Sequence, residues 1–279
     1  MTQDAINLFR LHYRQWPPYL SFSDEQITQV LIQYQKTWDR HYPEQPHLRA
    51  AVLGNNSITY RAGLYYDEER GHIAWLVMDP SADTGEVVFT LLAESSSYGI
   101  TQPAFGIIRD PFGLGWSGLS KQQLAPVIHH LQHQHDYCID QAWMVMEYRF
   151  LQAAAVNGLL EEMSDWEIEY SDDTAAGEWN ILLSSATEPA GECSAWSIPE
   201  YLESMPPDKW MTIEWIGLEP AFRGRRLGLH LLLQQLNRQQ QRGVEHIVLW
   251  TETKNHHARN FFRQHGFREV GEVVGLQVR

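Results

Sequence analysis

The spacing of hydrophobic and polar residues changes along the chain. Near the start, SDEQITQVLIQYQKTW has apolar residues at helical intervals, and Ser23 with Gln26 forms the polar pair of a capping box. Three runs typical of β-strands follow, separated by polar turn segments: SITYRAGLYY, HIAWLVMD and EVVFTLLA. The pattern predicts a helix and then an antiparallel meander. KQQLAPVIHHLQHQHDY, which follows a Gly- and Ser-rich stretch, is expected to be a helix because a proline near a helix start is tolerated.

From AWMVMEYRF onward, predicted strands alternate with predicted helices. The segments in chain order are a helix at LQAAAVNGLLEEM, strands at EWNILLSS, CSAWSIP and KWMTIEWIGLEP, a helix at LGLHLLLQQLNRQQQR, a strand at HIVLWTETK, a helix at HHARNFFRQH, and strands at FREVGE and VVGLQVR. The change of pattern places a domain boundary near Asp140. We therefore expect an N-terminal α/β domain at residues 1–140 and a second domain at residues 141–279.

Charge and composition narrow the range of partners. A formal net charge of -14 disfavours binding to nucleic acid or anionic membranes and mildly favours cationic ligands. Two cysteines are too few for a disulfide framework, and the first residues lack a signal-peptide pattern, so we expect a cytoplasmic protein. His129 and His133 have the i, i+4 spacing that can chelate a metal ion, but no carboxylate motif accompanies them and we expect no metal. Composition leaves the oligomeric state open.

The segment LEPAFRGRRLG concentrates arginine and glycine within an acidic chain. It lies between a predicted strand that ends at Pro220 and a predicted helix that begins near Leu227. Backbone N–H groups and the positive end of the helix dipole converge at such a junction, glycine lets the backbone approach a phosphate, and arginine adds charge. The segment therefore predicts an anion site. It matches neither the P-loop pattern GxxxxGK nor the dinucleotide pattern GxGxxG.

The same residues resemble the GNAT-type N-acetyltransferases, which bind acetyl-coenzyme A (acetyl-CoA). The family's first signature is a strand, a proline, an aromatic residue and RGxGxG, and this chain has LEPAFRGRRLG. The second signature spaces Asn, Ala, Tyr and Gly-Phe, and its positions here are Asn255, Ala258, Phe262, Gly266 and Phe267. The resemblance covers roughly residues 142–279. It implies an α/β fold with a central twisted, mostly antiparallel sheet, splayed strands and flanking helices.

The resemblance also implies where acetyl-CoA binds. The strands at 210–219 and 246–253 would part, so that the pantetheine arm lies between them, and the pyrophosphate would lie on the amides of residues 225–229. A backbone N–H near Leu218 would face the oxyanion of acyl transfer. The residues expected to bind the cofactor are Gly217, Leu218, Glu219, Arg223, Gly224, Arg225, Arg226, Leu227, Gly228, Leu229, Asn255 and Phe262.

Amine acylation needs a base, because an amine is protonated near neutral pH and has to lose a proton before it attacks. Glu214 is the candidate base. It lies in the middle of a predicted strand, with Thr212, Ile216 and Leu218 expected on the same face, where a carboxylate costs free energy unless it is paired, hydrated or functional. A half-exposed structural glutamate is the alternative interpretation.

The chain departs from the family pattern at two positions. The middle glycine of RGxGxG is Arg226, which we expect at a helix start without strain and with cofactor binding retained. Phe262 replaces the tyrosine that commonly protonates the departing thiolate, and it has no hydroxyl to donate. Tyr201, Thr251 and His256 are weak alternatives as the acid, and unassisted departure is another.

Two functional hypotheses remain from the sequence. The first is an enzyme that transfers acetyl from acetyl-CoA to a primary amine of a small molecule or peptide by direct attack. The alternative is a catalytically inactive acyl-CoA-binding or protein-interaction module. The first half is either a degenerate copy of the same fold, with GLGWSG at Gly113–Gly118 in the place of RGRRLG but without its basic residues, or an unrelated α/β domain. The sequence does not identify the acceptor.

Overall fold

The computed structural model describes residue 7 and residues 49–54, 59–68, 70–106, 119–150, 166–173, 177–186, 188–197 and 209–279. Several sequence predictions lie outside these ranges: the helices at SDEQITQVLIQYQKTW and LQAAAVNGLLEEM, the loop GLGWSG, and the side chain of Tyr201. In the described part of the chain, no helix is long and apolar enough to cross a membrane.

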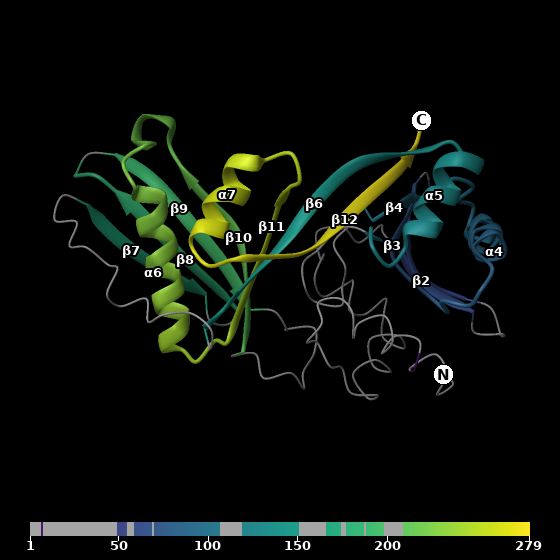
Figure 1. Cartoon of the computed structure of the whole chain (residues 1–279), viewed down its shortest axis with the longest axis horizontal. Helices are drawn as coiled ribbons and strands as arrows, with labels where there is room; N and C mark the ends of the chain where they lie inside the picture. The colour runs from purple at the N-terminus through teal and green to yellow at the C-terminus, as the bar shows by residue number, and fades with distance from the viewer. Residues whose placement is uncertain are drawn as a thin grey trace.

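The described strands form one 12-stranded sheet, and helices cover it in two lobes (Figure 1). The first lobe contains β1 (Arg49–Leu53), β2 (Tyr60–Tyr66), β3 (Gly71–Met78), α4 (Thr84–Ser97), β4 (Ala104–Phe105), β5 (Leu119–Ser120), α5 (Ala125–Gln134) and β6 (Tyr137–Arg149). The second contains β7 (Glu167–Asp173), β8 (Glu178–Ser184), β9 (Pro189–Ser197), β10 (Trp210–Leu218), η3 (Pro220–Phe222), α6 (Leu227–Gln241), β11 (His246–Glu252), α7 (His256–Gln264) and β12 (Arg268–Val278).

Both lobes repeat one order of elements. Apart from the two-residue strand β5 and the short helix η3, the segment β3-α4-β4-α5-β6 in the first lobe has the same succession as β10-α6-β11-α7-β12 in the second. In each lobe the strands before and after the first helix are parallel neighbours, whereas every other strand pair of the sheet is antiparallel. The mixed, mostly antiparallel sheet predicted from the resemblance is therefore confirmed.

The last strand of each lobe crosses into the other lobe. The sheet order is β1-β2-β3-β4-β12-β6-β11-β10-β9-β8-β7, so β6 pairs with β11 of the second lobe and β12 pairs with β4 of the first. Figure 1 shows β6 and β12 running side by side between the lobes. The predicted boundary at residue 140 lies inside β6, and the two lobes share one continuous sheet.

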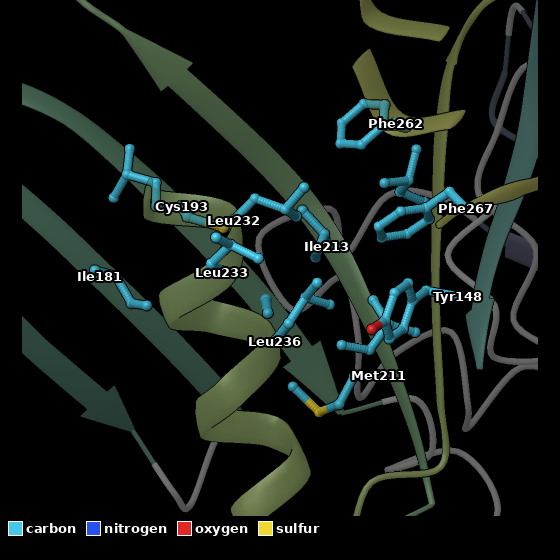
Figure 2. Close-up of a cluster of buried hydrophobic side chains, with 14 of the residues drawn as sticks. Tyr148, Ile181, Cys193, Met211, Ile213, Leu232, Leu233, Leu236, Phe262 and Phe267 are labelled. Atoms are coloured by element: carbon cyan, nitrogen blue, oxygen red, sulfur yellow. The ribbon is translucent and has the colours of Figure 1, made fainter. Parts of the chain in front are cut away.

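Two hydrophobic cores lie under the helices of the two lobes. The core of the second lobe packs α6 against β8, β9, β10 and β11, and Figure 2 shows Cys193 and Ile213 among Leu232 and Leu233 of α6. The core of the first lobe packs α4 and α5 against β2 and β3, and it includes Leu276 of β12. Strand exchange thus places a residue close to the last position of the sequence inside the first core.

Three sequence predictions differ from the structure. EVVFTLLA is part of α4, so the prediction of a strand there is wrong. Its β-branched residues favour a strand, but Asp83 caps a helix by accepting from the Glu86 N–H at 2.8 Å, and Val87 and Leu91 are buried four residues apart on the sheet. FREVGE and VVGLQVR form one bulged strand, β12, instead of two. β1 and β7 were not predicted.

Candidate active site

β10 and β11 pair at one end and separate at the other. Their parallel register covers only Trp210 with His246, Met211 with Ile247, and Thr212 with Val248. Beyond that point β10 continues to Leu218 paired with β9, and β11 continues to Glu252 paired with β6. The predicted splay between these strands is present, and it opens a gap in the middle of the sheet.

A β-bulge at Glu214 determines which side chains of β10 face this gap. Ile213 lies opposite Ala195 and Trp215 lies opposite Ser194, so Glu214 is an extra residue in the strand. An extra residue breaks the alternation of faces. Ile213 and Ile216 therefore both pack toward the core under α6, and Trp215 lies on the opposite face.

The bulge corrects the predicted surroundings of Glu214. Thr212 and Ile216 lie on opposite faces of β10, so the expectation that both share one face with Glu214 is wrong. Glu214 itself is half-buried. An insertion of this kind depends on the pairing with β9, which a period-two pattern in one strand cannot reveal.

The loop before α6 presents an uncapped helix N-terminus. α6 begins at Leu227, and no side chain among the described residues caps its first amides. Arg223, Gly224, Arg225 and Arg226 are all exposed. The Arg223 Nε donates to the Leu218 carbonyl at 3.1 Å, which ties the loop to the end of β10. Positive charge and unsatisfied N–H groups meet here, as the sequence predicted.

Arg226 does not sit at this helix start in an ordinary conformation. Its φ angle is 63°, in the left-handed region that favours glycine, and Gly224 has a φ of 78°. The expectation that Arg226 fits without strain is therefore wrong. The left-handed turn explains why the family pattern has glycine at the equivalent position, and a non-glycine residue there costs about 1 kcal/mol or more.

The equivalent helix of the first lobe has a carboxylate at its N-terminus. The element order makes the loop Asp79–Asp83, between β3 and α4, the counterpart of RGRRLG. The Asp83 carboxylate occupies the N-terminus of α4. In the same loop, hydrogen bonds from Ser81 to Asp79 lower the pKa of the Asp79 carboxyl below its ordinary value. GLGWSG, which the sequence offered as a possible counterpart, lies in the chain between β4 and β5 and outside the described residues.

A cavity of about 1040 Å³ extends from the end of β10, beyond its pairing with β11, to the N-terminus of α6 and to α7. Of the residues predicted to bind the cofactor, all except Arg225 and Leu227 line it. Arg225 instead lies over the Phe222 ring, with 5.7 Å between its Cζ and the ring centroid, and Leu227 is buried. Glu214 does not belong to the lining of this cavity, as far as the described residues define it.

The second family signature also lies at the cavity. Asn255 caps α7, because its Oδ1 accepts from the Ala258 N–H at 3.1 Å, and its place in the lining is where the sequence predicted it. Phe262 is 5% exposed and packs against Phe261 and Phe267, with ring centroids 5.2 and 5.4 Å away. Neither Thr251 nor His256 belongs to the described lining, so these two weak candidates for the acid are not brought to the site.

Some residues of the lining were not predicted. The β8-β9 hairpin contributes Leu182 and Glu192, and α7 with the residue after it contributes His257, Phe261 and His265. Burial lowers the pKa of His265, which favours its neutral form. The α7 residues lie near the second signature and could have been inferred from helical spacing. The hairpin residues carry no sequence signal, because only the sheet register brings them to β10.

Comparisons with known proteins agree with this geometry. Residues 144–267 match the model of the family described as Acetyltransferase (GNAT) family. Among solved structures, a tandem GNAT protein from the clavulanic acid biosynthesis pathway has a TM-score of 0.65 and 11% identity, over 98% of this chain and 93% of that chain. A GCN5-related N-acetyltransferase from Kribbella flavida has a TM-score of 0.52 and 11% identity, over 88% of this chain and 95% of that chain.

A third solved structure contains a longer protein. It is the GCN5-related glucosamine N-acetyltransferase region of a fungal multi-domain GH3 β-N-acetylglucosaminidase, with a TM-score of 0.62 and 12% identity, over 99% of this chain and 37% of that chain. At these identities the likeness shows the fold. A search of curated proteins found no match.

The splayed strands, the uncapped helix after them and the family match define the class of protein. Residues 144–267 match the GNAT acetyltransferase family, which is a family of acyltransferases, and the chain as a whole has a GNAT-like fold. Because the likeness to the tandem GNAT protein extends over both lobes, the first lobe shares the GNAT-like fold, and Asp83 caps the helix end that corresponds to the start of α6.

Proposed function

We propose that the second lobe transfers an acetyl group from acetyl-CoA to a primary amine. The observation that carries this proposal is that the end of β10, which has separated from β11, and the uncapped, arginine-flanked N-terminus of α6 line one cavity. A diphosphate needs the helix N-terminus with its arginines, and an extended thiol arm needs the free edge of β10. Acetyl-CoA supplies an activated thioester when it is bound.

The residues around α6 fit a diphosphate. A Cβ placed on Gly228 would meet only the Leu218 Cδ1, at 3.7 Å, so the first turn of the helix is open on the side of the cavity. Arg223 and Arg226 line the same end. Charge-assisted hydrogen bonds from arginine and from helix N–H groups are the strong contacts to phosphate oxygens.

The end of β10 fits the pantetheine arm and the reacting carbonyl. The Glu219 N–H donates to the Ala190 carbonyl at 2.9 Å, so Glu219 directs its N–H toward β9. Backbone groups of neighbouring residues point to opposite sides of a strand, which directs the Leu218 N–H into the gap. This N–H is the donor that we assign to the negative charge on the acyl oxygen during transfer.

Direct attack by the amine suits the side chains of the cavity. Its described lining contains no serine, threonine or cysteine that could carry the acetyl group. Cys193 is buried in the core, and burial raises the pKa of its thiol. In the proposed reaction the amine nitrogen forms a bond to the acyl carbon, the carbon–sulfur bond breaks, and the nitrogen loses a proton.

We assign proton removal to Glu214, acting at the bulge of β10. Its position after the last residues that pair β10 with β11 places it where the gap begins. Because Glu214 does not line the cavity, one ordered water between the carboxylate and the amine would complete the path. Phe262 donates no proton, so thiolate departure in this scheme depends on solvent or on protonation of the thiolate by the released proton.

Release of free thiol from acetyl-CoA across a panel of primary amines tests the function. We expect thiol release, and we expect Glu214→Gln to lower kcat by about a hundredfold while leaving acetyl-CoA affinity unchanged. Glu167→Gln removes the same charge from an exposed position of β7 and should leave kcat unchanged. Acetyl-CoA binding without thiol release from any amine would contradict the proposal.

A second candidate function is acyl-CoA binding without catalysis. The replacement of the usual tyrosine by Phe262 and the absence of Glu214 from the described lining favour it. In that case acetyl-CoA affinity persists and Glu214→Gln has no rate to change. For either function we propose a cytoplasmic location, which the two free cysteines support.

A further inference from the structure

The sheet face opposite α6 carries an unusual group of side chains at the mouth of the gap. Leu182 lies opposite Glu192, and Glu192 lies opposite Gly217, so one lateral row crosses β8, β9 and β10. Directly opposed residues of antiparallel strands share a face. Cys193, the neighbour of Glu192, packs into the core under α6, so the row lies on the other side of the sheet.

Trp215 extends this group over Gly217. A Cβ placed on Gly217 would lie 2.9 Å from the Trp215 Nε1 and 3.0 Å from its Cζ2, so the indole covers the position where a side chain would stand. The Trp215 side chain is nevertheless 56% exposed, and Leu182 is 39% exposed. The indole, Leu182 and Glu192 all line the cavity.

Charge is distributed unevenly around the cavity. The cationic or potentially cationic residues of the lining, Arg223, Arg226, His257 and His265, belong to the loop before α6 and to α7 or its end. Glu192 is the carboxylate on the opposite face, and Glu219 directly follows β10. In the described part of the chain, no lysine, arginine or histidine forms an ion pair with Glu192. A carboxylate beside an exposed indole provides both attractions that a cation experiences, ion pairing and cation–π contact.

The distance from Glu192 to the reacting position determines which charged group of the acceptor Glu192 can bind. Glu192 is one strand away from Gly217, and the gap lies on the far side of β10. Two strand spacings amount to on the order of 10 Å. A carboxylate at that distance cannot remove the proton of the attacking nitrogen, but it can hold a second charged group of the same acceptor.

We propose that Trp215 and Glu192 form an acceptor subsite that binds a cationic group other than the amine that is acetylated. The acceptor class is therefore an amine with a second positive charge on the order of 10 Å from the nucleophile. This inference rests on the proposed acetyl transfer. It assigns the face opposite α6 to the acceptor and the α6 face to the cofactor.

The test compares α,ω-diaminoalkanes of increasing length with n-alkylamines of the same length, using the full chain and acetyl-CoA. We expect kcat/KM to rise about tenfold for a diamine long enough to span the two positions. Glu192→Gln and Trp215→Leu should each lower that value about fivefold and change the value for the n-alkylamine by less than about twofold.

A matched control and a second variant separate local recognition from general effects. Glu188→Gln removes the same charge from an exposed residue of the β8-β9 turn that does not line the cavity, and it should change neither value. Gly217→Ala displaces the indole without altering Glu192, and it should reproduce the loss of preference for the diamine over the n-alkylamine that is seen with Trp215→Leu. Only this ratio is compared for Gly217→Ala, because Gly217 also belongs to the proposed cofactor site. For the other variants, unchanged affinity for acetyl-CoA checks that the protein is folded.

Calorimetric binding of the preferred diamine to the protein saturated with CoA distinguishes this inference from the proposed function. Diamine binding that depends on Glu192, with no thiol release from any amine, supports the subsite and contradicts acetyl transfer. Thiol release that is equal for both amine series, or unaffected by Glu192→Gln, overturns the subsite and leaves acetyl transfer standing. Loss of acetyl-CoA affinity in Trp215→Leu assigns the indole to the cofactor and overturns the subsite. If the diamine does not bind and no amine causes thiol release, both the subsite and the proposed acetyl transfer are overturned.

Discussion

Thr212 of β10 and Val248 of β11 are the last paired residues before the two strands separate. The Thr212 Oγ1 donates to the Val248 carbonyl at 3.5 Å, at the point where the gap begins. Toward the start of both strands the register is parallel and buried, and toward their ends each strand keeps a different antiparallel neighbour. The fork therefore follows from a difference in strand partners, and the bulge at Glu214 lies two residues beyond it.

We expect hydrogen exchange to report cofactor binding at this fork. Among the described residues, no strand pairs with the backbone groups of β10 that point into the gap, so their amides should exchange quickly in the free protein. Acetyl-CoA should slow exchange at residues 216–219 and 226–229 and leave the first turn of α4 unchanged, because Asp83 already occupies that helix end. Equal protection at both helix ends would contradict the assignment of a single phosphate site.

Leu276→Ala should destabilise the protein severely despite its place near the end of the sequence. The Leu276 side chain is fully buried in the core of the first lobe. Truncation of a buried leucine costs about 2–5 kcal/mol in the free energy of unfolding. Urea denaturation measures the change. Gln277→Ala, at the exposed neighbouring position, should cost less than about 1 kcal/mol, and similar costs for the two variants would argue against the exchange of β12.

Phe262→Tyr tests whether a missing acid limits the rate. The added hydroxyl lies at the position of the family's tyrosine and can reach the cavity that Phe262 lines. We expect kcat to rise severalfold with acetyl-CoA affinity unchanged. Phe261→Tyr, which adds the same hydroxyl at the adjacent position, should give no increase. An unchanged kcat in Phe262→Tyr would show that protonation of the thiolate is not the slow step.

Stability should fall as the pH drops below about 6.5. Burial lowers the pKa of His230 in the first turn of α6, and burial likewise lowers the pKa of His72, His135 and His265. A histidine that stays neutral in the folded protein takes up a proton in the unfolded chain at its ordinary pKa, which favours unfolding at lower pH.

Histidines and carboxylates change the stability of the protein in different pH ranges. The hydrogen bond from Arg259 lowers the pKa of Glu269, whose contribution is therefore present above its ordinary pKa of 4.5 and is lost only at lower pH. Urea midpoints at about pH 7.5 and about pH 5.5 should differ, and His230→Gln should reduce the difference. The exposed His256 provides the control, since His256→Gln should leave the difference unchanged.

Local patterns predicted the parts of the site that consist of contiguous residues. The left-handed turn at Gly224 and the start of α6 follow from RGRRLG, and the cap of α7 follows from Asn255. The prediction of a strand at EVVFTLLA is wrong because its β-branched residues favour a strand, whereas the Asp83 cap and the burial of one face on the sheet stabilise a helix.

The sequence by itself determined the anion-binding end of the site, because a helix N-terminus, its glycine turns and its arginines are all local in the chain. Only the tertiary structure decided the acceptor end and the joining of the lobes. Glu192 reaches Gly217 through a strand register, Trp215 changes face through a bulge, and β6 and β12 exchange lobes through long-range pairing. Such relationships depend on hydrogen bonds between distant strands, and no spacing within a single segment encodes them.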